Sequence, residues 1–228
     1  STNGIAHYRF DVRLGPGPYD VVRIHRVVKE RRPFRPIRTR NSVFMVHGSG
    51  QRFTDIFLNA GAENPDPTTS SPIYLASKGI DVWGIDLAWN FIPEETTDFS
   101  FLEGWGLMKD VKHTLASMSI ARFFRGITGQ GFSKMNLLGF SYGGGIAYAA
   151  AGLETQERRF FRDIKGIIPV DFALKLDNEK WRQLACEVSG NNRKDYENGA
   201  YFNSNALLKT LGEAALDAPD ETSKMSHQ

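Results

Sequence analysis

Hydrophobic and polar positions along the first thirty residues predict two β-strands joined by a turn. Residues 5–14 (IAHYRFDVRL) and 19–30 (YDVVRIHRVVKE) are rich in β-branched and aromatic side chains. The turn-forming run Gly15-Pro16-Gly17-Pro18 separates them. We therefore expect an antiparallel hairpin in this part of the chain.

Further along, short and almost wholly apolar runs alternate with helical patterns. The runs cover residues 43–46, 82–87, 135–140 and 167–170, and they have the length of strands that are covered on both faces. Apolar residues at helical spacing lie between them, at 108–118 and 146–151. This alternation predicts an α/β fold, in which a mostly parallel sheet carries helices on both faces.

The strand pattern stops after Asp171. Residues 181–188 and 207–215 each carry an apolar stripe at helical spacing. We therefore predict a core domain over residues 1–171 and a helical appendage over residues 172–228.

Composition narrows the classes of partner. The chain has 228 residues, 41% of them hydrophobic and 24% charged, which suffices for one sizeable core. A net charge of +2 argues against a nucleic-acid partner. No apolar stretch approaches the roughly 18 to 20 residues that a transmembrane helix needs.

The segment Arg23–Arg40 holds eight Lys or Arg against one Glu, and it is either an anion-binding patch or a solvated loop. We adopt the loop interpretation.

Cys186 is the single cysteine, so the chain has no internal disulfide and its redox compartment stays open. The sequence begins at Ser1 rather than Met, which fits removal of a signal peptide, of an initiator residue or of a cloning remnant. Of these, the first favours a secreted or periplasmic protein.

A nucleophile motif stands between a predicted strand and a predicted helix. Residues Gly139-Phe140-Ser141-Tyr142-Gly143 match G-x-S-x-G. Acyl transfer needs a serine raised on a sharp turn, and the flanking glycines leave room for that backbone. The N-terminus of the following helix favours developing negative charge. Ser141 is therefore the candidate nucleophile, in chemistry that requires neither a cofactor nor a metal.

A second motif makes the chain resemble a known superfamily. His47-Gly48-Ser49-Gly50 directly follows the predicted strand at 43–46, and residues 79–86 contain a G-x-D-V-W run. With the nucleophile motif, residues 5–171 resemble serine esterases and lipases of the α/β-hydrolase superfamily. The resemblance implies that the backbone N–H of Ser49, or alternatively of Gly50, forms an oxyanion hole with the N–H of Tyr142. It also implies the order serine, acid, histidine, so His47 is expected to be structural.

The rest of a catalytic triad is harder to place. Asp171 follows the strand at 167–170 and is the candidate acid, although it could instead cap a helix or form a salt bridge. The only histidine after Ser141 is His227, in a polar tail that cannot hold a base rigidly. In the superfamily that the chain resembles, further strands precede the catalytic histidine, and a lid is often inserted after the strand that precedes Asp171. The resemblance therefore implies that the late strands are missing from this chain and that residues 172–228 form a helical cap or lid that ends at a processing site. We expect a companion chain from the same precursor to supply the catalytic histidine and the late strands, unless the fold is rebuilt in another way.

Aromatic residues suggest the substrate. The segment from Leu87 to Trp105 leaves a strand at the sheet edge where open α/β folds bind ligands. We expect an apolar pocket wall from some of its rings, with Gly50 and the neighbours of Ser141: Trp89, Phe91, Phe99, Phe101, Trp105, Phe140 and Tyr142. The leading function is hydrolysis of a hydrophobic carboxylic ester or lactone through an acyl-enzyme. The alternatives are a lyase, cyclase or acyltransferase on the same fold, and a non-catalytic binding protein.

Overall fold

A computed structural model describes residues 4–59, 69–173, 175 and 177–199 of the protein. The chain divides into two compact units. The first comprises Ser1–Phe91 and Gly104–Leu176, and the second comprises Ile92–Glu103 and Asp177–Gln228. The predicted domain boundary after residue 171 stays a prediction.

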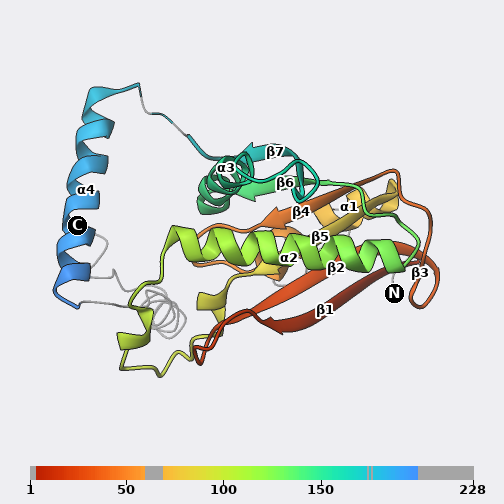
Figure 1. Ribbon diagram of the computed structural model, residues 1–228, viewed down its shortest axis with the longest axis horizontal. Helices are drawn as coiled ribbons and strands as arrows, with labels where there is room; N and C mark the ends of the chain where they lie inside the picture. The colour runs from red at the N-terminus through yellow and green to blue at the C-terminus, as the bar shows by residue number, and fades with distance from the viewer. Residues whose placement is uncertain (1–3, 60–68, 174, 176, 200–228) are drawn as a thin grey trace, which may run out of the picture. The chain divides into compact units, whose positions relative to one another are not determined.

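A seven-stranded sheet forms the first unit (Figure 1), with the order β1-β2-β5-β4-β6-β7 and β3 paired to β2. Its strands are β1 (Ile5–Arg13), β2 (Val21–Arg32), β3 (Arg35–Pro36), β4 (Asn41–Val46), β5 (Ile80–Asp86), β6 (Met135–Phe140) and β7 (Ile164–Val170). β1 and β2 form the antiparallel hairpin that the sequence predicted. β2 is antiparallel to β5, whereas β5, β4, β6 and β7 run parallel.

Helices cover both faces of this sheet, as predicted. The first unit contains α1 (Ser71–Ser77), α2 (Leu107–Ile127) and α3 (Tyr142–Glu154), with short π- or 3₁₀-helical turns at η1 (Thr54–Leu58) and η2 (Ala88–Phe91). The apolar residues of α2 and α3 pack with Phe44 and Val46 in one core. Val43 and Met45 pack with η1 and α1 in a second core. Successive residues of β4 thus point to opposite faces, because side chains alternate along a strand.

Part of the basic segment Arg23–Arg40 differs from the predicted solvated loop. β2 extends through it to Arg32, and Arg26 is buried in a bidentate ion pair with Asp81. Arg125 of α2 contacts the same carboxylate. The loop interpretation was wrong for these strand residues because a buried carboxylate from β5, 55 residues away, compensates Arg26. Residues beyond Arg32 are mostly exposed.

The second unit contains the turn η3 (Ser100–Leu102) and the helix α4 (Glu179–Glu197). α4 confirms the helix expected over residues 181–188, and none of its residues is buried within the described parts of the chain. The predicted helix at 207–215 lies outside the described residues. Within the described parts, no strand follows β7, and no helix has the length and apolar character needed to cross a bilayer.

Candidate functional site

Ser141 occupies a one-residue turn between β6 and α3. β6 ends at Phe140 and α3 begins at Tyr142. Ser141 has φ 51° and ψ −119°, a conformation that non-glycine residues rarely adopt and that is typically found at functional sites. The turn therefore has the strained backbone expected of a nucleophile that is lifted off the end of a strand.

Two flanking glycines are required by close backbone approaches. A Cβ atom on Gly139 would lie 2.0 Å from the carbonyl oxygen of Gly143. A Cβ atom on Gly143 would lie 2.3 Å from the carbonyl oxygen of Val46, at the end of β4. The motif glycines thus allow α3 to start directly against β4 and β6, which places Ser141 at the carboxyl edge of the parallel strands.

The turn after β4 lies beside Ser141. A Cβ atom on Gly48 would be 3.2 Å from the Cβ of Ser141. The Gly48 N–H donates to Oε1 of Gln51 at 3.2 Å, so this N–H is already engaged. Ser49 is exposed, and Gly50 has φ 71°. Tyr142 is the first residue of α3, so its N–H has no acceptor within the helix.

His47 is fully buried and both of its ring nitrogens are engaged. Nδ1 lies 2.8 Å from the carbonyl oxygen of Gly48, while Nε2 accepts the N–H of Leu87 at 3.2 Å and lies 3.1 Å from Nδ2 of Asn90. This pattern fits a neutral ring that donates from Nδ1. Burial lowers the pKa of this imidazole, which also favours the neutral form. The geometry supports a structural role for His47 as a clamp between the turn after β4 and the end of β5.

Asp171 follows the strand next to the nucleophile. Phe140 and Val170 are paired in register, and the Ser141 N–H donates to the carbonyl oxygen of Val170 at 2.9 Å. Asp171 is exposed and has φ 51°. Ser141 and Asp171 therefore leave adjacent strands at the same level, each through a left-handed backbone. This position suits a triad acid, and Asp171 stays the candidate.

A buried carboxylate that the sequence did not reveal contacts Tyr142, the residue after Ser141. The Tyr142 hydroxyl donates to Oδ2 of Asp110 at 2.9 Å, and Asp110 is buried in the first turn of α2. Burial raises the pKa of the Asp110 carboxyl to about 6. Burial, with Asp110 as neighbour, also raises the pKa of the Tyr142 phenol. Asp110 was missed because a first-turn aspartate has an ordinary role at a helix N-terminus.

No hydrogen bond between a described histidine and Ser141 is found. His25 lies 3.1 Å from Oδ2 of Asp86, in a buried His–Asp pair. However, β2 lies three positions from β6 in the sheet, which corresponds to roughly 14 Å at the usual strand spacing of about 4.8 Å. His227 lies outside the described residues.

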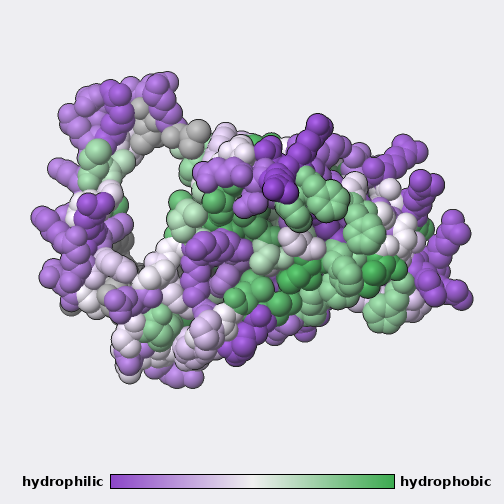
Figure 2. Space-filling view, in the orientation of Figure 1, coloured by the Kyte–Doolittle hydropathy of each residue, from purple (hydrophilic) through white to green (hydrophobic). Residues whose placement is uncertain are grey.

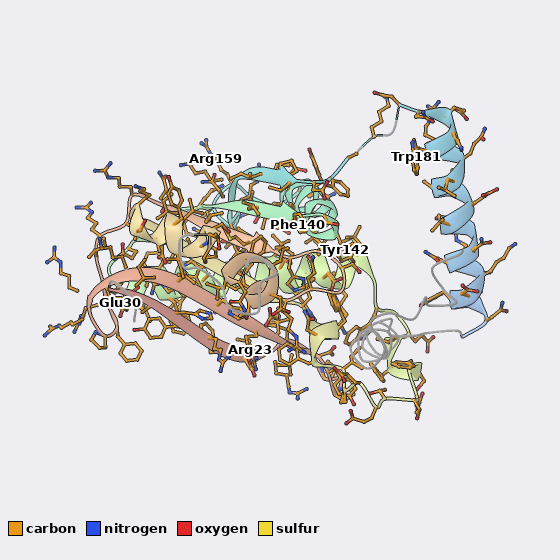
Figure 3. All side chains as sticks on the ribbon, turned by 180° about the vertical axis from the view of Figure 1, so that it is seen from behind. Arg23, Glu30, Phe140, Tyr142, Arg159 and Trp181 are labelled. Atoms are coloured by element: carbon orange, nitrogen blue, oxygen red, sulfur yellow. The ribbon has the colours of Figure 1, made fainter. Side chains whose placement is uncertain are left out.

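The aromatic residues predicted to line the pocket do not all lie beside Ser141 and the turn after β4. Phe140 and Tyr142 flank Ser141 (Figure 3), and the Phe140 ring borders Gly48. The Trp89 ring meets the His47 ring edge-on, with 5.3 Å between centroids. The Phe91 ring instead lies under the guanidinium of Arg23 on β2, with 5.4 Å between Cζ and the ring centroid. Trp89 and Phe140 are thus the nearer candidates for a substrate wall.

Phe99 and Phe101, two further residues predicted to line the wall, belong to the second unit. Their rings pack against each other with 6.3 Å between centroids. Trp105 of the first unit contacts the ammonium of Lys109. All five rings of the segment 89–105 are partly exposed.

Comparison with solved structures finds similar folds. A candidate lipase from Sulfolobus solfataricus matches with a TM-score of 0.57 and 24% identity, over 73% of this chain and 45% of that one. A brefeldin A esterase, a bacterial homologue of human hormone-sensitive lipase, matches with a TM-score of 0.52 and 18% identity, over 80% and 45% of the two chains. The chain therefore spans less than half the length of these relatives. No protein-family model matches the sequence, and neither does the sequence of any curated protein.

Proposed function

From the premise that this chain has the α/β-hydrolase fold, we propose that it carries the nucleophile and oxyanion hole of a serine esterase. One observation carries the proposal: Ser141 holds a left-handed backbone at the junction of β6 and α3, with Gly48 of the turn after β4 against it. A strained serine at the carboxyl edge of a parallel sheet, beside a second turn of free N–H groups, is the arrangement that acyl transfer needs.

The proposed reaction has two steps. Oγ of Ser141 bonds to the ester carbonyl carbon while its proton passes to a base, and the N–H groups of Ser49 and Tyr142 stabilise the resulting oxyanion. The bond to the alcohol oxygen then breaks, and the base returns the proton to the leaving alcohol. Water adds to the acyl-serine in the second step and releases the acid, which regenerates Ser141.

We propose that a companion polypeptide from the same precursor, outside these 228 residues, supplies the base. Three observations support this: no described histidine is found hydrogen-bonded to Ser141, the match covers less than half of each similar structure, and β7 forms an edge of the described sheet. Ile168 and Val170 of this edge strand are 43% and 39% exposed. A further parallel strand would cover them and would bring its own carboxyl end close to Ser141 and Asp171.

The proposed substrates are hydrophobic carboxylic esters or lactones. Trp89 and Phe140 both border the turn after β4, where the acyl group would lie next to the oxyanion hole. Pockets that bind apolar groups are lined mainly by such rings. The C-terminal helical segment is the candidate lid for this pocket.

A fluorophosphonate probe tests the nucleophile, because it forms a covalent bond with an activated serine. The protein as isolated should be labelled at Ser141, and Ser141→Ala should lose the label. Ser77→Ala, at an exposed serine at the end of α1, serves as the matched control that retains labelling. Labelling at another serine, with Ser141 unmodified, would refute the assignment.

Intact-mass analysis of active protein tests the companion polypeptide and should reveal a companion fragment or a longer chain. Full activity of a lone 25.6 kDa chain would refute the companion polypeptide.

A further inference from the structure

The loops that precede the parallel strands gather at the end of the sheet opposite Ser141. β4, β6 and β7 begin at Asn41, Met135 and Ile164, so the segments 31–40, 128–134 and 155–163 share one edge. We call these three segments the basal face. β6 spans six residues, and the basal face therefore lies roughly 20 Å from Ser141 at about 3.3 Å per strand residue.

Basic residues are concentrated on the basal face. Its three segments contain nine Lys or Arg and two acidic residues, out of 28 basic and 26 acidic residues in the whole chain. The rest of the chain therefore holds 19 basic and 24 acidic residues, so the small net charge conceals a strong separation of charge. Of the two acids, Asp163 is already paired with Arg122.

Most of these cations lack a counter-charge within the described residues. Arg31, Arg32, Arg35 and Arg38 line a hollow of about 980 Å³ together with residues 128–131, and the structure gives none of the four an ion pair. Lys134 and Arg159 line a neighbouring hollow of about 760 Å³ and are likewise unpaired in the described chain. Segment 128–134 contributes to both hollows, so the positive surface is continuous.

Large apolar side chains protrude from the same segments. Phe34, Phe132, Phe160 and Phe161 are 72%, 59%, 84% and 62% exposed. Exposed apolar patches of this kind mark interaction sites. Figure 2 shows apolar side chains adjoining charged ones toward the end of this unit that carries β3.

We propose that the basal face docks on the surface of an anionic lipid membrane. Charge complementarity favours an anionic membrane as the partner, because clustered arginines and lysines bind acidic headgroups. Exposed phenylalanines enter the boundary between headgroups and acyl chains. Each of the three segments contributes at least one ring and at least one cation, as such a boundary requires. Docking in this way turns the Ser141 end of the unit away from the bilayer.

A single-stranded nucleic acid fits these observations less well, because base stacking requires a free ring face. The Phe34 ring already stacks on Tyr8, with 5.0 Å between centroids. Phe160 and Phe161 lie edge-on to each other at 5.5 Å and 84°, and Phe132 packs against Gly126. Insertion into lipid requires only the protruding edges of these rings.

Vesicle sedimentation tests this proposal with the intact protein. Phosphatidylcholine vesicles that contain phosphatidylserine should bind the protein, and vesicles of phosphatidylcholine alone should not. The double variant Arg35→Glu/Arg38→Glu should weaken binding at least about tenfold, since each basic residue near an anionic surface contributes about 1 kcal/mol. Phe160→Ala/Phe161→Ala should weaken it as well, even in low salt.

A matched control exists at the other end of α2. Leu107 and Met108 are also adjacent and exposed, at 40% and 49%, and Leu107→Ala/Met108→Ala should leave vesicle binding unchanged. Fluorophosphonate labelling of Ser141 should be unchanged in every variant, so this proposal and the proposed function can fail separately. The docking proposal is overturned by equal binding to neutral and anionic vesicles, by no binding, or by a preference for single-stranded DNA over the vesicles.

Discussion

The hydroxyl of Tyr142 donates a 2.9 Å hydrogen bond to Oδ2 of Asp110 where α3 packs against α2. Tyr142 is also the residue whose backbone N–H is the proposed oxyanion donor. The buried Asp110 carboxylate on α2 thereby fixes the side chain of Tyr142, the first residue of α3. This relationship gives the first two predictions.

Tyr142→Phe should destabilise the fold by about 2 kcal/mol at pH 8, because a buried carboxylate loses its hydrogen-bond donor. The loss should be smaller at pH 5, where Asp110 is mostly protonated and no charge is left unpaired. Urea unfolding at the two pH values measures both effects. Tyr148→Phe on the same helix is the control, since no hydrogen bond to that hydroxyl is found within the described residues, and it should change little. A loss in Tyr142→Phe that does not depend on pH would contradict the explanation.

Asp110→Asn should remove a pH dependence of stability. The folded protein keeps the Asp110 proton up to a pKa of about 6, whereas the unfolded chain releases it near the ordinary carboxyl pKa of 3.8. The folded state then binds more protons in this window, so the contribution of Asp110 to stability is present below pH 4 and is lost as the pH rises to 6. The full effect is about 3 kcal/mol, from roughly 1.36 kcal/mol per pKa unit. Wild-type protein and Asp110→Asn should therefore diverge in unfolding free energy between pH 4 and 6. Parallel curves would show that the carboxyl titrates normally.

The two motif glycines should not tolerate a methyl group. Gly143→Ala places a Cβ atom 2.3 Å from the carbonyl oxygen of Val46, and Gly139→Ala places one 2.0 Å from that of Gly143. Backbone must move in each case, and we expect losses of at least about 3 kcal/mol. Gly152→Ala on the same helix meets no atom within 4 Å and should stabilise the protein by about 0.5 to 1 kcal/mol. Thermal unfolding of the three variants gives the comparison, and equal effects at Gly143 and Gly152 would argue against the close approach.

Ser141→Gly should be more stable than Ser141→Ala. Glycine adopts a backbone with positive φ without the Cβ clash, and relief of such strain contributes about 1 to 2 kcal/mol. Both variants lose Oγ and should lose fluorophosphonate labelling. Chemical denaturation compares their stability directly. If Ser141→Ala proved the more stable of the two, the left-handed backbone would not be a source of strain.

Trp89→Ala should raise KM for long-chain esters more than for acetyl esters, because the Trp89 ring borders the turn beside which we propose that the acyl group binds. Phe91→Ala is the informative comparison, since that ring lies against Arg23 on β2. We expect Phe91→Ala to alter chain-length preference less than Trp89→Ala. Steady-state kinetics with p-nitrophenyl esters of increasing length distinguishes the two, and the opposite order would move the acyl pocket toward β2.

Local sequence determined the elements and the turn at Ser141. Alternating apolar residues and a Gly-Pro turn specified the hairpin, and short apolar runs specified β4 to β7, because strand and helix periods are set by each residue's immediate neighbours. Gly139, Ser141 and Gly143 could be assigned together because a one-residue junction between strand and helix imposes their spacing. Helix α1 was not predicted, since seven residues carry too little periodicity.

Tertiary structure alone decided which distant residues meet. Asp110 lies 32 positions from Tyr142, and Arg26 lies 55 positions from Asp81, so neither pair leaves a local pattern. The basal face likewise exists because parallel strands bring three separate loops to one edge. Sequence spacing encodes the direction in which a side chain leaves its own helix or strand. The contacts across the sheet depend on packing, which brings together residues that lie far apart in the sequence.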